Sequence, residues 1–170
     1  MAVLPILTAP DRRLKQKAQP VAEVNASVRQ LMENMAETMY AAPGIGLAAP
    51  QVGISLRVIC IDLEHAQEKQ AKNPIFIANP VIVHAEGEIC WKEGCLSIPD
   101  YTAEVNRASR VIVEGLGHDN RPLSLEGNDL LAVCLQHEID HLNGKLFIDH
   151  ISPLKRSIIV KKLKKQKEDP

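Results

Sequence analysis

The chain has 170 residues, of which 45% are hydrophobic and only 3% aromatic, so we expect one domain over residues 1–170 with a mainly aliphatic core. The net charge of −1 is unevenly distributed, because residues 155–170 carry seven basic and two acidic side chains, whereas residues 1–154 carry 13 and 19. We expect no DNA partner. A basic tail on an acidic body instead suggests an anionic partner for the tail alone.

The sequence contains no segment typical of export or membrane insertion. Residues 1–10 lack a basic start and are interrupted by Pro5, so they do not resemble a signal peptide. No apolar run is long enough to span a membrane, so no membrane partner is expected. The cysteines form no dense disulfide pattern, which favours reduced thiols and a cytoplasmic protein. They are Cys60, Cys90, Cys95 and Cys134.

The first predicted element is a helix that follows an irregular, proline-containing segment over residues 1–24. Asn25 or Ser27 can cap its N-terminus, and Pro43-Gly44 ends it. Between these points the apolar residues recur at helical spacing, which is typical of a helix with one buried face. They are Val28, Leu31, Met32, Met35 and Met39.

A glycine-rich segment, Gly44–Gln51, follows this helix and matches the G-x-G-x-x-A pattern of dinucleotide-binding proteins. That pattern needs a strand before it and a helix after it, whereas here a helix precedes it and a predicted strand, residues 56–62, follows. We therefore interpret the segment as a loop whose glycines let the backbone of a ligand approach closely. Gln51 would be a polar group at the rim of that loop.

The middle of the chain is predicted to form strands and turns. Residues 64–74 are polar and predict a surface loop. Residues 75–78 and 81–84 are rich in strand-forming side chains and predict two strand segments on either side of an Asn-Pro pair. Residues 86–99 are expected to turn the chain again.

A hairpin and a buried helix come next. Residues 111–114 and 123–126 alternate apolar and polar side chains around a turn, which predicts the hairpin. Residues 129–142 are apolar on nearly every face of a helix, and such a helix is usually buried. Asn128 is the expected N-cap of this helix, and Asn143-Gly144 is its expected C-terminal stop.

The predicted buried helix contains an H-E-x-x-H sequence at His137–His141. Residues four apart lie on one face of a helix, so His137 and His141 can direct two imidazoles at one metal ion. Glu138 lies beside them, where it can accept a proton from metal-bound water. Burial of three such side chains is unfavourable unless something binds them, so the sequence favours a metal site.

A catalytic site of this kind uses three protein ligands, so a third one is needed. Cys95 is the best candidate, because the preceding glycine gives its backbone freedom. Cys134 could face the site, but it is better interpreted as a small buried residue that lines a pocket. Asp149 and His150 are alternatives that require the chain to turn back after the helix. Other upstream candidates are Cys60, Cys90, His84 and His118.

Two other functions fit part of this pattern. A zinc endopeptidase with H-E-x-x-H usually has its third ligand downstream, where this sequence offers neither the expected histidine nor a nearby glutamate. A structural zinc site with one cysteine and two histidines would have a closed fourth position and no need for Glu138.

Three segments together closely resemble the signature motifs of bacterial peptide deformylases, in the same order and with similar spacing. They are Gly44–Gln51 (GIGLAAPQ), Glu93–Ser97 (EGCLS) and His137–His141 (HEIDH). The resemblance extends from Pro10-Asp11-Arg12 to Ser152–Lys155, which is nearly the whole chain. It implies an enzyme that removes the formyl group from the N-terminal formyl-methionine of nascent polypeptides and releases formate.

The resemblance also implies a role for each matching residue. The implied metal ligands are Cys95, His137 and His141. Glu138 would be the general base, and Gln51 and the Leu96 backbone N–H would stabilise the oxyanion. The implied substrate-binding residues are Gly44, Ile45, Gly46, Gly94, Val133 and Cys134. Glu93 would pair with Arg107 and brace the cysteine loop.

We expect an α+β fold with antiparallel β-sheets around the metal-binding helix and a C-terminal helix. The resemblance implies Fe²⁺ as the working ion, and Zn²⁺, Ni²⁺ or Co²⁺ can substitute, since thiolate and imidazole suit several metals. The chain departs from many family members at Trp91, Lys92 and Thr102, so its contacts at the substrate rim should differ.

Residues 152–170 predict a basic C-terminal helix, with Ser152 as N-cap and Pro153 in the first turn. Its apolar residues are expected on one broad face: Leu154, Ile158, Ile159 and Leu163. Two interpretations are open. The helix is a structural cap docked by that face, or its basic side chains bind ribosomal RNA near the exit of the nascent chain.

Overall fold

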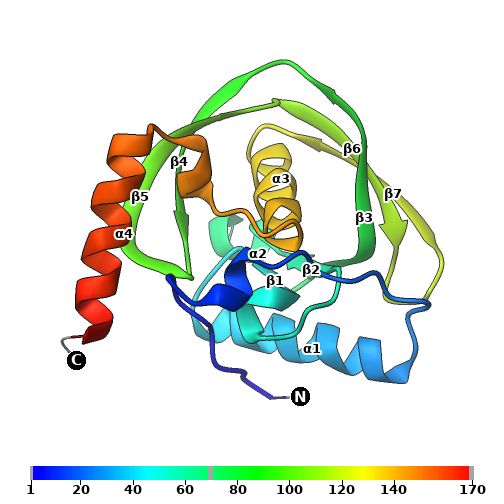
Figure 1. The fold of residues 1–170 in the computed structure, drawn as a ribbon. Coiled ribbons are helices and arrows are strands. Elements are labelled where there is room, and N and C mark those ends of the chain that lie inside the picture. The colour runs from blue at the N-terminus through cyan, green and yellow to red at the C-terminus, as the bar shows by residue number, and fades with distance from the viewer. Residues whose placement is uncertain (1, 69–70, 169–170) are drawn as a thin grey trace.

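A computed structural model describes residues 2–68 and 71–168. Over these residues the chain forms an α+β fold in which antiparallel strands surround helix α3 (Leu130–Leu142), and helix α4 (Pro153–Glu168) lies beside the strands at one side (Figure 1). The predicted fold class is thereby confirmed. Within the described ranges, no helix is long and apolar enough to cross a membrane.

The larger sheet is antiparallel and has the strand order β1-β2-β3-β6-β7. Its strands are β1 (Gly46–Ala48), β2 (Val58–Ile61), β3 (Ile75–Glu86), β6 (Arg110–Leu116) and β7 (Pro122–Asn128). The predicted hairpin is confirmed as β6–β7. The two segments predicted around Asn79-Pro80 are instead one strand, because a register shift between Ala78 and Val81 accommodates the proline.

The smaller sheet consists of β4 (Ile89–Cys95) and β5 (Ile98–Arg107), which pair as a hairpin. The turn expected within residues 86–99 is present between Cys95 and Ile98, but the two strands that it joins were not predicted. The strand pattern is hidden because Glu93 and Arg107, although charged, face inward and neutralise each other. A sequence prediction from the pattern of polar and apolar residues places charged residues at the surface, whereas the ion pair between these two makes their burial possible.

Helix α1 (Ala26–Ala41) begins as predicted, since the Asn25 side chain accepts a hydrogen bond of 2.9 Å from the Val28 backbone N–H. Its methionine-rich face is buried. A short helix, α2 (Leu63–Glu68), occupies part of the predicted surface loop. Asp62 promotes this helix by accepting a hydrogen bond of 3.1 Å from the His65 N–H, as an N-cap does.

The predicted loop Gly44–Gln51 also contains regular structure, namely β1 and the 3-10 helix η2 (Ala49–Val52). β1 has only three residues, which is too short for a periodic pattern, and it forms by pairing with β2. The loop prediction was thus correct only for the residues before Gly46. Because β1 is an edge strand, one side of its backbone is left for another segment to pair with.

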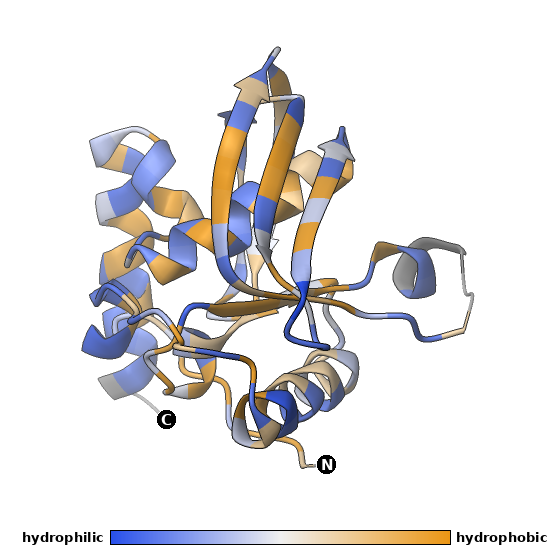
Figure 2. Cartoon of the chain, turned by 90° about the vertical axis from the view of Figure 1, so that its right-hand side faces the viewer, coloured by the Kyte–Doolittle hydropathy of each residue, from blue (hydrophilic) through white to orange (hydrophobic). Residues whose placement is uncertain are grey.

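Helix α3 is buried as predicted and packs its apolar face on the larger sheet. Figure 2 shows the hydrophobic residues concentrated along the strands of this sheet. The predicted N-cap was displaced by one residue: Asn128 ends β7, and Asp129, at φ 52°, precedes the helix. The predicted stop is confirmed, with Gly144 at φ 74° after the last turn.

Helix α4 is preceded by Ser152, whose hydroxyl accepts a hydrogen bond from the Lys155 N–H. The broad apolar face predicted for this helix is only partly buried. Leu163 is 2% exposed and packs into the core, whereas Leu154 is 72% and Ile158 is 46% exposed. The helix lies along the small sheet on a narrower contact than its sequence pattern predicts.

Candidate active site and metal centre

Helix α3 presents the side chains of the H-E-x-x-H sequence to one site. The rings of His137 and His141 are 5.0 Å apart between centroids, as expected for residues one helical turn apart. Both imidazoles are largely buried. Burial holds the pKa of His141 well below its usual value, so its imidazole is neutral and able to ligate a metal.

Cys95 brings the third ligand from the small sheet. It is the last residue of β4, and the pairing of β4 with β5 shifts in register between Gly94 and Cys95. Its Sγ lies 3.4 Å from His141 Nε2, and the ligand atoms of Cys95, His137 and His141 all lie within 4.8 Å of one another. One thiol and two imidazoles form a donor set that suits a transition metal. The three predicted ligands therefore form a metal site.

Glu93 orients one of the ligands from behind. Its Oε1 lies 2.9 Å from His137 Nδ1, which leaves Nε2 of that imidazole directed at the metal site. Glu93 also accepts hydrogen bonds of 2.6 and 2.9 Å from Arg107, so the predicted pair is present and buried. Burial lowers the pKa of His137, but contacts with Cys95 and Glu93 outweigh it and raise that pKa well above the usual value.

Glu138 is 5% exposed, and its Oε1 has no hydrogen-bond partner among the described residues. Burial raises the pKa of this carboxyl to about 7. Gly46 packs closely against this carboxylate, since a Cβ at position 46 would collide with Glu138 Oε2. A buried carboxyl with a free oxygen beside three metal ligands is suited to hold and transfer a proton.

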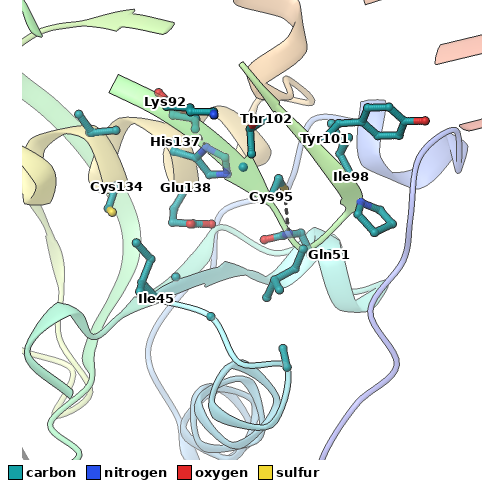
Figure 3. A pocket seen from close by; sticks show the side chains of 18 of the residues that line it. Ile45, Gln51, Lys92, Cys95, Ile98, Tyr101, Thr102, Cys134, His137 and Glu138 are labelled. Atoms are coloured by element: carbon teal, nitrogen blue, oxygen red, sulfur yellow. Dashed lines mark hydrogen bonds and ion pairs between the residues drawn. The ribbon is translucent and has the colours of Figure 1, made fainter. Parts of the chain in front are cut away.

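Gln51 is fixed in place at the edge of the metal site. Its Oε1 accepts a hydrogen bond of 2.9 Å from the Ala48 N–H, and its Nε2 donates to Ser97 Oγ at 3.0 Å. The same Nε2 lies 3.6 Å from Cys95 Sγ (Figure 3). The amide group predicted at the rim is thus buried and directed at the metal site.

A pocket of about 900 Å³ opens over this constellation. Figure 3 shows Cys95, His137 and Glu138 at its wall. All of the predicted substrate-binding residues line it: Gly44, Ile45, Gly46, Gly94, Val133 and Cys134. So do Leu96 and the three predicted rim residues, Trp91, Lys92 and Thr102. An open wall at Cys95 and His137 does not fit a closed structural zinc site.

The alternative ligands are occupied elsewhere. Asp149 binds Lys15 with oxygen–nitrogen distances of 3.0 and 3.1 Å, and His150 Nε2 lies 2.7 Å from Asp140. The downstream ligand of an endopeptidase is therefore not supplied by either residue. Cys60 is buried in β2, and Cys134 lines the pocket with its pKa raised to about 12 by burial, so it remains a neutral thiol.

Sequence reasoning missed the contacts that extend the network behind the metal. Arg107 Nη1 lies 2.8 Å from Asp140 Oδ2, and this oxygen also contacts His150. Asp140 lies within the H-E-x-x-H sequence, but nothing in that pattern indicates which way it points. Ser97, which holds Gln51, was also missed, although it lies within the recognised segment around Cys95.

Comparisons with known proteins agree with this geometry. The family model described as "Polypeptide deformylase" matches residues 3–157. The peptide deformylase of Methylocella silvestris is 53% identical over 167 residues, which cover 97% of this chain and 85% of that protein. A peptide deformylase crystal structure from Legionella pneumophila has a TM-score of 0.89 at 45% identity, covering 99% of both chains. That of the Ehrlichia chaffeensis enzyme in complex with actinonin has a TM-score of 0.91 at 40% identity, covering 98% of both. The chain belongs to the polypeptide deformylase family.

Proposed function

We propose that Glu138 is the general base with which this metal-dependent hydrolase removes the formyl group from the N-terminal formyl-methionine of newly made polypeptides. The deformylase activity follows from family membership, and the proposal concerns the residues and the metal that perform it. The observation that carries it is the free Oε1 of buried Glu138, next to the Cys95–His137–His141 cluster at the pocket wall.

The proposed chemistry divides between the metal and the chain. Cys95, His137 and His141 would hold an ion that, when bound, polarises a carbonyl and lowers the pKa of water. Glu138 accepts a proton from the attacking water and returns it to the departing methionine nitrogen. Negative charge develops on the formyl oxygen, where the Gln51 amide and the Leu96 backbone N–H donate hydrogen bonds.

We propose that the working ion is Fe²⁺. A thiolate ligand donates more charge than a carboxylate and suits a soft or borderline metal. The same donor set also accepts Zn²⁺, Ni²⁺ or Co²⁺, so these ions can substitute. A ferrous ion beside the Cys95 thiolate should be sensitive to oxidation.

The proposed substrate lies extended between two strand edges. β1 and β4 both border the pocket, and Ile45, Gly46 and Gly94 supply backbone groups there. The methionine side chain would enter the apolar part of the pocket beside Val133 and Cys134. Glycine is required at position 46, because any side chain would displace the Glu138 carboxylate.

The test is formate release from a formyl-Met-Ala-Ser peptide by iron-loaded protein prepared without oxygen. Glu138→Gln should yield a folded, metal-loaded protein with less than about 1% of the wild-type kcat, since proton transfer commonly contributes at least 100-fold. Substitution of the exposed Glu88 by Gln is the matched control and should leave kcat unchanged. An active Glu138→Gln enzyme would remove this residue from the mechanism.

We also propose that α4 binds ribosomal RNA and that the protein works in the cytoplasm, where formylated chains emerge. The lysines of α4 are exposed, and Lys161, Lys164 and Lys165 do not line the cleft between α4 and β5. The four cysteines are free thiols, as a reducing compartment would keep them. Binding through phosphate contacts should weaken steeply with salt.

A further inference from the structure

A second cleft continues from the active-site pocket toward the C-terminal helix. It has a volume of about 530 Å³ and lies between β5 and α4. Lys92, Tyr101 and Thr102 line both the pocket and this cleft, so the two adjoin at these residues of the hairpin. In Figure 3 these three side chains lie on the side of the pocket away from Ile45. We call the cleft the tail groove.

The tail groove combines an apolar floor with unpaired positive charge. Lys92, Lys155 and Lys162 contribute ammonium groups, and Glu104 contributes one acidic group. None of the three lysines forms an ion pair with a residue in the described part of the chain. The apolar lining residues are Ala103, Ile151, Ile158 and Ile159. A groove of this kind suits an extended peptide with acidic side chains.

The arrangement also accounts for the exposed apolar residue on α4. Ile158 is 46% exposed, and it lies in the groove between Lys155 and Lys162, which are seven residues apart and on the same face of the helix. Lys164 is nine residues from Lys155, which places it on the opposite face. The basic residues of α4 are therefore divided between the tail groove and the surface proposed to face RNA.

We propose that the tail groove binds the downstream part of the substrate polypeptide and favours acidic side chains there. The proposal rests on the proposed function, because it extends the path of the same substrate. Crossing two strands and reaching the helix layer spans about 20 Å, or on the order of six extended residues. The preference should therefore concern side chains at about the fifth to eighth position of the nascent chain.

The experiment compares ten-residue peptides that share the start formyl-Met-Ala-Ser and carry three Glu, three Gln or three Lys at positions 6 to 8. Formyl-Met-Ala-Ser alone reports the basal reaction. At low ionic strength the Glu peptide should have a kcat/KM about three- to tenfold above the Gln peptide, as expected for a few exposed ion pairs. The higher kcat/KM should come from a lower KM at unchanged kcat, since contacts far from the reacting bond stabilise substrate and transition state equally. The difference between the peptides should vanish in 0.5 M salt, because exposed charges are screened.

Reversing the charge of single lysines on α4 tests which residues cause the preference for acidic peptides. Lys162→Glu should abolish the advantage of the Glu peptide and improve the Lys peptide, with the short substrate unaffected. Lys164→Glu changes the net charge equally on the opposite face of α4 and should leave all ratios unchanged. Both variants retain a good helix former, so α4 should persist.

The outcomes are distinguishable from a failure of the proposed function. If the short peptide is not hydrolysed, the proposed function itself is wrong. If it is hydrolysed and the three long peptides have equal kcat/KM at low salt, the tail groove does not bind substrate. If Lys162→Glu weakens ribosome binding without changing peptide selectivity, the groove lysines serve RNA, and the proposal is also wrong.

Discussion

Glu93 Oε1 lies 2.9 Å from His137 Nδ1, and this contact links the small sheet to helix α3 beside the metal site. Glu93 belongs to β4, whereas His137 belongs to the helix that packs on the larger sheet. Arg107 donates hydrogen bonds to both oxygens of the Glu93 carboxylate and also contacts Asp140, one residue from the ligand His141. The orientation of the imidazole therefore depends on a buried charge network rather than on helical geometry alone.

The first prediction concerns this network. Glu93→Gln keeps the shape of the side chain but removes the charge that pairs with Arg107 and polarises His137. We expect metal affinity to fall by about 10- to 100-fold, as is typical when a partner of a ligating histidine is removed. Competition with a chelator measures the affinity, and Glu88→Gln is the exposed control. Unchanged affinity in Glu93→Gln would show that Glu93 does not tune the ligand.

The second prediction concerns the pKa of about 7 that burial produces at Glu138. Because the folded pKa lies above the ordinary value, the stabilising contribution of the protonated carboxyl is present at low pH and is lost as the pH rises through about 7. Metal-free Glu138→Gln cannot ionise. The free energy of unfolding of this variant, relative to that of wild type, should therefore rise by on the order of 2 kcal/mol between pH 5 and pH 8. Urea unfolding with chelator present measures this, and a constant difference would contradict the assignment.

The third prediction concerns the ligand supplied by the small sheet. Cys95→Asp keeps a ligand but replaces sulfur with a hard oxygen donor. We expect the variant to bind metal and to lose most of its formate release. Metal content and turnover are measured on the same sample. Wild-type turnover with iron would mean that Cys95 does not contact the working ion.

The fourth prediction concerns oxidation. Iron-loaded enzyme should lose activity in air and be protected by catalase, because a ferrous thiolate centre reacts with peroxide. Nickel- or cobalt-loaded enzyme should keep its activity under the same conditions. A zinc-loaded enzyme that is fully active and indifferent to peroxide would contradict the proposal of iron.

The fifth prediction concerns α4. Changing Lys161, Lys164 and Lys165 to Glu should reduce co-sedimentation with ribosomes at low salt, because each lost phosphate contact removes part of the electrostatic attraction. Hydrolysis of formyl-Met-Ala-Ser should stay near normal, since these residues lie outside the pocket. Equal co-sedimentation of variant and wild type would leave α4 with the structural role of a cap.

Local sequence patterns predicted the elements whose determinants lie within one or two turns of chain. The Asn25 cap, the methionine face of α1, the β6–β7 hairpin and the Gly144 stop are all confirmed. The β4–β5 hairpin was missed because its inward charged residues violate the polar-outside pattern. The exposed side of α4 was missed because periodicity shows which residues share a face but not how much of that face a neighbour covers.

The site shows the same division. By itself, the sequence determined that His137 and His141 share a helix face, because a spacing of four residues is enough to specify this. Local sequence made Cys95 the best of several candidates for the third ligand, and motif resemblance supported that choice. Only the tertiary structure brought its Sγ to 3.4 Å from Nε2 of His141, which is 46 residues away. The packing of the small sheet against α3 also places Arg107 in contact with Asp140. His150 contacts Asp140 as well and therefore does not bind the metal. Contacts between residues far apart in the chain depend on how whole layers pack, and no local spacing encodes that distance.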